Sequence, residues 1–226
     1  MEEIWKLEYN GRLAQIFRDN GKHKFFLDNI KQVEYDEING VLLSDNGERY
    51  ALEVRNNGKE FICLDGIEYP AYKAVGYMEF SSDGKHFAYR AMKDNGKCCV
   101  VIDGKEGREY DDVSNIRYSS AGTLAYCASV SGLWCMVLDG EEESLYGWVG
   151  PCVFGPKSHY AYAVKKNDKW GIIVDGMDIG WSDNKILTIH FSVGLHVDYL
   201  CAKDGGYYSV KKDVADMYRC TDLGPL

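Results

Sequence analysis

Short apolar runs separated by glycine-containing turns extend along the whole chain. Near the middle, such runs cover residues 115–118, 124–129, 133–138 and, more weakly, 144–148, and a glycine lies in each turn between them. Runs of this length bounded by glycine turns predict β-strands, and no part of the chain has the sustained spacing of an amphipathic helix. The segment therefore predicts four short antiparallel strands joined by hairpins.

This four-strand pattern recurs about every 37 residues, and three markers share the period. The first marker is an aromatic residue, a polar turn and an apolar run with Ala-Tyr, at residues 80–89, 118–126 and 154–162. The second is an Asp-Gly pair that closes the third run, at Asp65, Asp103, Asp139 and Asp175, with Asp28-Asn29 as the same feature in the first repeat. The third is an aromatic residue a few positions later: Tyr35, Tyr69, Tyr110, Tyr146, Trp181 and Tyr218.

The period divides the chain into six repeats, at approximately residues 1–36, 37–73, 74–112, 113–149, 150–184 and 185–226. One four-stranded sheet cannot bury both of its faces alone, whereas six sheets packed face to face around an axis can. We therefore predict an all-β fold, a single-domain six-bladed β-propeller of four-stranded antiparallel blades. Trp5 aligns with Ile116, and Tyr218 aligns with Trp181, so the chain should begin with an innermost strand and end with an outermost one. No strand would then be exchanged between the two ends.

The repeats resemble the WD-repeat-like propeller repeats of the TolB type. That motif has an aromatic residue, then Ser-Pro-Asp-Gly-Lys, then an apolar strand with Ala-Tyr or Ala-Phe. The segment Phe80–Lys85 departs from it only by Ser82 in place of proline. The resemblance covers nearly the whole chain and implies the propeller fold. It implies little about function, because such propellers serve as partner-binding platforms, enzyme gates and occasionally active sites.

Composition and charge narrow the classes of function. The 226 residues are 46% hydrophobic and carry a formal net charge of −9. This hydrophobic fraction is typical of a globular protein and excludes a mainly disordered chain. The acidic balance argues against nucleic acid and anionic membrane surfaces as partners. No apolar run reaches the roughly 18 residues of a membrane span, and the first residues do not resemble a secretory signal.

Cysteine and histidine positions bear on the compartment and on metals. The eight cysteines contain no Cys-x-x-Cys pair, and most lie in apolar runs, which indicates a reducing cytoplasm and no disulfide framework. Cys127 and Cys135 flank one turn, where two buried thiols are preferred to a disulfide. His86, His159 and His196 align in three repeats, so a repeated structural role is preferred to a metal triad. We expect no metal, no cofactor and a monomer.

The fourth repeat departs from the others in two loops. Its second hairpin, at residues 129–133, lacks the basic residue that the other repeats carry there, and the connection at 146–151 is apolar. Both loops leave a propeller on the same face. We therefore predict an exposed apolar patch, a candidate interface, with these members: Val130, Leu133, Trp148 and Val149. The alternative is that Trp148 folds back between blades.

The inner strands of a propeller line its central channel, and four polar residues lie on or near them: Lys6, Glu79, Arg117 and His190. They could form a ligand or catalytic site, or a solvated, charge-balanced channel wall, which is the preferred interpretation. No pair of carboxylates is placed for acid–base catalysis.

The sequence therefore predicts a non-catalytic binding or scaffold module that recognises a protein or peptide through the loop face with Trp148. The alternative function is a sugar, metabolite or enzyme site in the channel around Glu79, Arg117 and His190.

Overall fold

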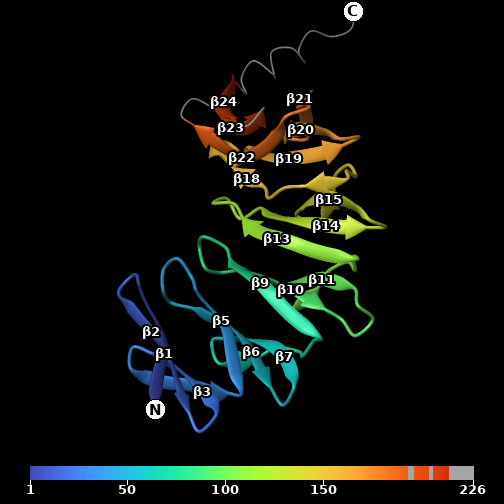
Figure 1. Cartoon of the computed structure of the whole chain (residues 1–226). Coiled ribbons are helices and arrows are strands. Elements are labelled where there is room, and N and C mark those ends of the chain that lie inside the picture. The colour runs from blue at the N-terminus through green and yellow to red at the C-terminus, as the bar shows by residue number, and fades with distance from the viewer. Residues whose placement is uncertain (193–195, 204–205, 214–226) are drawn as a thin grey trace, which may run out of the picture. The chain divides into compact units, whose positions relative to one another are not determined.

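The computed structural model describes residues 1–192, 196–203 and 206–213, which form an all-β structure (Figure 1). In these ranges every regular element is a β-strand except one short 3-10 helix, η1 (Pro156–Ser158). The prediction of an all-β fold is confirmed. None of the described residues belongs to a helix that is long and apolar enough to cross a membrane.

The described strands pair into six antiparallel sheets, and the first three have four strands each. Their orders are β1-β2-β3-β4, β5-β6-β7-β8 and β9-β10-β11-β12. The first sheet contains β1 (Glu2–Tyr9), β2 (Arg12–Asp19), β3 (Lys22–Leu27) and β4 (Ile30–Tyr35). The second contains β5 (Glu37–Leu43), β6 (Tyr50–Asn56), β7 (Lys59–Leu64) and β8 (Ile67–Glu68). The third contains β9 (Ala74–Phe80), β10 (Phe87–Met92), β11 (Cys98–Ile102) and β12 (Lys105–Glu106).

The fourth sheet has the order β13-β14-β15-β16, with β13 (Asp112–Tyr118), β14 (Leu124–Val130), β15 (Leu133–Leu138) and β16 (Glu141–Glu142). The fifth has the order β17-β19-β20-β21, and β18 also pairs with β19. Its strands are β17 (Trp148–Val149), β18 (Val153–Phe154), β19 (Tyr160–Lys166), β20 (Lys169–Val174) and β21 (Met177–Ser182). The sixth has three described strands, β22 (Lys185–Ser192), β23 (His196–Lys203) and β24 (Gly206–Asp213).

Sheet order follows chain order, so the sheets are meanders, with one interruption in the fifth sheet, where β17 and β18 both pair with β19. The N-terminal strand β1 pairs with β2, which confirms that the chain begins with the first strand of its own sheet. The predicted final strand around Tyr218 lies outside the described residues.

The fourth strand of the fourth repeat differs from the sequence prediction. β16 covers only Glu141–Glu142, and pairing resumes at an isolated bridge between Trp134 and Tyr146. The expected fourth strand at 144–148 is therefore reduced to the single bridge at Tyr146, and its end at Trp148 is wrong. Trp148 instead begins β17, because the chain has already crossed to the next sheet after Tyr146.

The repeated aromatic marker also needs one correction. In the second and third repeats the residues that bridge back to the third strand are Tyr72, opposite Glu60, and Tyr110, opposite Cys98. The marker in the second repeat is therefore Tyr72 and not Tyr69, which lies nearer to the preceding turn.

In the first five repeats an aspartate in the turn between the third and fourth strands ties that hairpin to the start of the second strand. Asp65 accepts a hydrogen bond from the backbone N–H of Tyr50 and another from Nε of Arg49, both at 2.8 Å. Asp65 and Gly66 both have positive φ, 53° and 83°, and Gly66 takes this conformation without steric cost. The Asp-Gly marker thus combines a tight turn with a side-chain clamp.

Histidine replaces arginine in two of these clamps. Nδ1 of His86 lies 2.7 Å from Asp103, and Nδ1 of His159 lies 2.7 Å from Asp175. The predicted repeated structural role is confirmed for His86 and His159, whereas Nε2 of His196 lies 3.9 Å from Asp213 on the paired strand and does not form this clamp.

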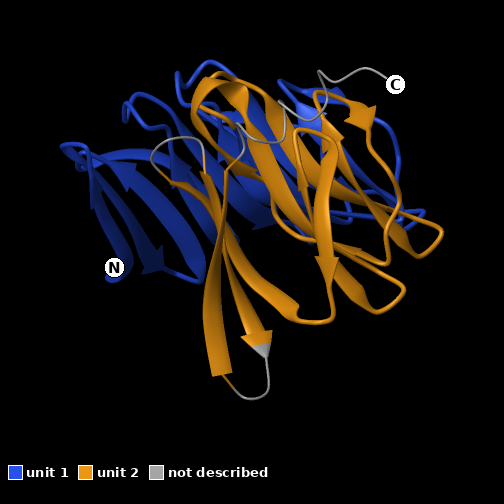
Figure 2. Ribbon diagram, turned by 90° about the horizontal axis from the view of Figure 1, so that it is seen from above, with its two compact units in different colours: residues 1–118 blue, residues 119–226 orange. Residues whose placement is uncertain are grey.

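The chain divides into two compact units, residues 1–118 and 119–226 (Figure 2). In the first unit, apolar faces pack around Phe25 and Leu52 between the first and second sheets, and around Phe87 between the second and third. In the second unit, the cores include Tyr162 and, between the fifth and sixth sheets, Ile172. The second and fifth sheets are therefore buried on both faces, which explains why their central strands are almost continuously apolar.

Candidate functional site

Trp148 begins β17, the first strand of the fifth sheet, and pairs in register with Lys165 on β19. The corresponding pair in the second sheet is Glu37 on β5 and Arg55 on β6, which form an ion pair. At this repeat position an indole therefore stands where another repeat has a carboxylate. The substitution places a large apolar ring beside a lysine at the end of the sheet.

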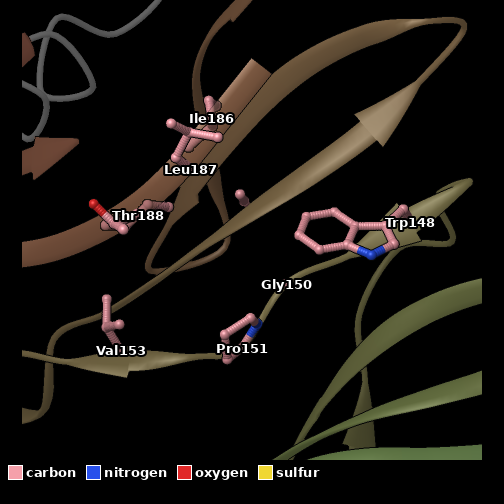
Figure 3. A pocket seen from close by; sticks show the side chains of 9 residues that line it. Trp148, Gly150, Pro151, Val153, Ile186, Leu187 and Thr188 are labelled. Carbon is pink, nitrogen blue, oxygen red and sulfur yellow. The ribbon is translucent and has the colours of Figure 1, made fainter. Parts of the chain in front are cut away.

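The Trp148 indole borders an apolar cavity of about 200 Å³ in the second unit (Figure 3). Its walls are Trp148, Gly150, Pro151, Val153 and Ala163 of the fifth sheet and residues 186–189 of β22, and we call it the Trp148 groove. Figure 3 shows the indole extending over Gly150 toward the strand with Ile186 and Leu187. A Cβ atom at Gly150 would lie 2.8 Å from Cη2 of Trp148, so the indole can occupy this position only above a glycine.

Ala163 provides the space for this groove. The corresponding residues of the first three sheets are Ile16 on β2, Glu53 on β6 and Arg90 on β10, whose side chains are all larger. Arg90 fills its position by reaching Asp112, with 2.8 Å between Nη2 and Oδ1. The short side chain of Ala163 leaves the equivalent volume of the fifth sheet open.

Of the four residues predicted for the apolar patch, Trp148 alone lines the groove. It keeps 39% of its surface exposed, while its ring packs edge-on against Trp170 with 5.2 Å between centroids. Leu133 is exposed and Val130 half-buried, both at the hairpin between β14 and β15. Val149 is 3% exposed and belongs to the core, which corrects its assignment to the patch. Successive strand residues face opposite sides, so an exposed Trp148 places Val149 inside.

The opposite wall of the groove, on β22, was not recognised in the sequence. Its pairing with β23 shifts between Ile186 and Thr188, and the intervening Leu187 keeps 39% of its surface exposed. Such a bulge turns a side chain out of the regular alternation. The adjacent apolar residues Ile186 and Leu187 were the available signal, because a half-buried strand would alternate apolar with polar positions.

Lysines outnumber carboxylates in the two segments next to the groove in sequence, residues 165–169 and 183–185, which also carry Asp168 and Asp183, although the chain is acidic overall. Four lysines belong to the strand ends and the hairpin of these segments: Lys165, Lys166, Lys169 and Lys185. Lys165 lies opposite Trp148 and forms a 3.0 Å ion pair with Asp168. Lys185 directly precedes Ile186. The groove therefore has apolar walls and a locally basic margin.

Two of the four predicted channel residues, Glu79 and Arg117, share a second cavity of about 250 Å³ in the first unit. They lie near the ends of β9 and β13. The cavity is completed by the end of β5, the turn after it and neighbouring residues: Leu42, Leu43, Asp45, Phe80, Ser82 and Tyr118. We call it the Glu79 pocket.

The other two channel residues have separate partners. Lys6 forms a 2.8 Å ion pair with Glu8 on its own strand. His190 lies on β22 in the second unit, with its side chain 64% exposed and Nε2 3.7 Å from Oδ2 of Asp198.

The charge of Glu79 is held in a partly desolvated position. Burial raises the pKa of its carboxyl group, the positive charge of Arg117 and the backbone N–H of Tyr118 oppose that increase, and the negative charge of Asp45 adds to it. Within the described residues, no cluster of three or more histidine, cysteine, aspartate and glutamate side chains could hold a metal ion. The pocket thus presents separate negative and positive groups.

Neither a protein-family model nor a curated protein matches the chain. Solved structures do match. The β-propeller domain of the Trilobed protease from Pyrococcus furiosus, described as having an open velcro topology, is 12% identical with a TM-score of 0.51. That alignment covers 94% of this chain and 83% of the propeller domain.

Prolyl oligopeptidase B from Galerina marginata matches with 10% identity and a TM-score of 0.54, over 93% of this chain but only 39% of its own. TolB from Acinetobacter baumannii is 14% identical over 74% of this chain and 50% of its own, with a TM-score of 0.45, which is too low to argue from. At these identities the first two structures show the fold alone. The chain has a β-propeller fold, built here from antiparallel sheets that mostly have four strands.

Proposed function

We propose that this chain is a six-bladed propeller that acts as a non-catalytic binding module and recognises a peptide segment of a partner protein in the Trp148 groove. The exposed indole beside an apolar cavity is the observation that carries the proposal. Tryptophan is enriched among the residues that dominate binding energy at protein interfaces, where a large ring can be desolvated against a partner. The single-domain ring, a monomeric state and a cytoplasmic location complete the proposal.

The expected occupant is an extended acidic peptide with one large apolar side chain. β17 and β22 are both terminal strands of their described sheets, so each has a backbone edge at which an extended segment can pair. The cavity volume suits one apolar side chain, with Pro151 and Val153 as part of its wall. The lysine margin, which includes Lys166 and Lys185, favours carboxylates beside that anchor.

The proposal can be tested with short synthetic peptides in which glutamates flank a central leucine, phenylalanine or tryptophan. Fluorescence anisotropy should show micromolar binding for at least one of them, and a matched peptide with lysines in place of glutamates should bind at least about tenfold more weakly. Trp148→Ala should weaken the acidic peptide at least about tenfold. Leu133→Ala removes an exposed apolar side chain outside the groove and should leave the affinity unchanged.

Equal binding of the acidic and basic peptides would contradict the assigned partner chemistry. Unchanged binding by a folded Trp148→Ala protein would contradict the assigned site. Absence of binding by all three acidic peptides at about 1 mM would reject the peptide-recognition function.

A further inference from the structure

We propose that the Glu79 pocket binds a small zwitterion of the α-amino acid class, with the ammonium group beside Glu79 and Asp45 and the carboxylate at Arg117. This site lies in the first unit, and its proposed ligand is a free small molecule, so it is separate from the peptide groove.

The pocket arises from one position that recurs in successive repeats. Glu79 pairs with Ala88 in the third sheet, and Leu42 pairs with Ala51 in the second, so the two occupy the same place in their sheets. Arg117 has the corresponding place in the next repeat, just before the aromatic residue and the serine turn. Three neighbouring first strands thus supply an apolar, an acidic and a basic side chain to one cavity.

The carboxylates of Glu79 and Asp45 on the acidic side of the pocket repel each other, and a bound cation would offset this repulsion. Asp45 is close enough to Glu79 to disfavour its ionised form, and partial burial disfavours it further. An ammonium group would pair with both carboxylates and offset this repulsion. A perturbed carboxyl group in a cavity is also more often found at binding sites than elsewhere on a protein.

The basic side of the pocket requires an anionic group in the same ligand. Arg117 is exposed, and its guanidinium can bind a carboxylate through two parallel hydrogen bonds. A simple cation would add nothing to Arg117, and a neutral sugar would not offset the repulsion between Glu79 and Asp45, which Arg117 opposes only in part. The half-buried Leu42 offers an apolar surface to the ligand's side chain, so we expect apolar amino acids to bind best.

Isothermal titration calorimetry of the full chain with each common L-α-amino acid tests the proposal. L-leucine should bind, whereas isoamylamine, which lacks the carboxylate, and isocaproate, which lacks the ammonium group, should each bind at least about tenfold more weakly. Leucine binding should weaken as the pH falls, because a protonated Glu79 cannot pair with the ammonium group.

Glu79→Gln and Arg117→Gln should each weaken leucine binding at least about tenfold. The matched controls, Glu8→Gln and Arg18→Gln, change exposed charges of the same unit outside the pocket and should have no effect. Trp148→Ala should also bind leucine normally, which separates this site from the proposed peptide function. Circular dichroism and thermal unfolding would verify that each variant is folded.

Several results would overturn the proposal. Equal binding of leucine and isoamylamine would reduce the pocket to a cation site, and equal binding of leucine and isocaproate would reduce it to an anion site. Failure of every amino acid at about 10 mM, or folded Glu79→Gln and Arg117→Gln proteins with unchanged affinity, would exclude the assigned ligand class.

Discussion

The Trp148 groove and the Glu79 pocket are built on the same repeat framework but have opposite chemistry. Residues of first strands line both sites. The first-strand residue that pairs with the repeated alanine of the second strand belongs to each: Val153, opposite Ala161, lines the groove, and Glu79, opposite Ala88, lines the pocket. The groove is apolar because Trp148 and Ala163 stand where the second repeat has the charged residues Glu37 and Glu53. The pocket is charged because Glu79 and Arg117 occupy a position that is apolar in neighbouring repeats.

The difference shows which positions of the repeat maintain the fold and which are free to vary. The positions that maintain the second strand and its clamp hardly change, and they include Ala51, Ala88, Ala125, Ala161 and the aspartates of the third-to-fourth-strand turns. These alanines are fully buried, so a larger side chain would disturb the packing. Several first-strand positions, and the second-strand position of Ala163, border solvent or cavities and tolerate charge, aromatic rings or small residues. Candidate sites in this chain are therefore departures from the repeat at those positions.

Replacing Trp148 with alanine should have the largest effect of the changes considered. Loss of the indole removes one wall of the groove and should cost about 2–4 kcal/mol of peptide affinity, as for other aromatic anchors. Anisotropy titration with the acidic peptide measures the change. Leucine binding in the Glu79 pocket serves as the control; a parallel loss there would mean that the variant disturbs more than the groove.

Val153→Glu gives the groove the acidic side chain that the pocket has at the equivalent position. Because the groove is apolar and no arginine lines it, the new carboxylate should lower the free energy of unfolding by about 1–3 kcal/mol. It should also repel the acidic peptide. Urea denaturation and peptide titration measure the two effects, with Val153→Met as the matched uncharged variant. A Val153→Glu protein as stable as Val153→Met would show that the groove is more solvated than its lining implies.

The shared framework can be tested at its aspartate clamps. Asp65→Ala removes the acceptor for both Tyr50 and Arg49 and should lower the free energy of unfolding by about 1–2 kcal/mol. Asp139 accepts the backbone N–H of Leu124 at 2.8 Å in a repeat with threonine at the arginine position, so Asp139→Ala should cost less. Urea denaturation gives both values. Equal losses would mean that the arginine or histidine adds nothing to the clamp.

The elements that could be predicted from sequence depend on local rules. An Asp-Gly turn after an apolar run is recognisable because the positive φ and the side-chain acceptor are required within a few residues. Glu79 and Arg117 could be singled out because they are charged at a position next to a repeated aromatic residue. Their joint pocket with Leu42 follows from the repeat register, although Leu42 itself carries no chemical signal.

The parts that could not be predicted depend on where strands start and on contacts between distant segments. Val149 was misplaced because Gly150 and Pro151 resemble a loop, which concealed the two-residue strand before them. The β22 wall was missed because its sequence signal, the adjacent apolar pair Ile186 and Leu187, does not by itself show that a bulge turns Leu187 outward. The groove forms only when β22 packs beside a fifth sheet that has alanine at position 163.

Glu79→Leu, which gives the third repeat the side chain of the second, should have the smallest effect and should reverse the usual sign of a mutation. The raised pKa of Glu79 means that the folded protein holds this proton more tightly than the unfolded chain does. Below the ordinary value of 4.5 both states are protonated and the carboxyl group costs nothing. As the pH rises through the folded-state pKa, the group ionises in a partly buried position and its full cost develops.

The variant should therefore be more stable than the wild type at about pH 7, by no more than about 1 kcal/mol, and this gain should shrink toward about pH 4. Urea denaturation at both pH values measures it. A carboxylate that costs stability without a ligand is expected at a binding site and not in a structural clamp, so a Glu79→Leu protein that is less stable at neutral pH would place Glu79 with the structural residues of the repeat.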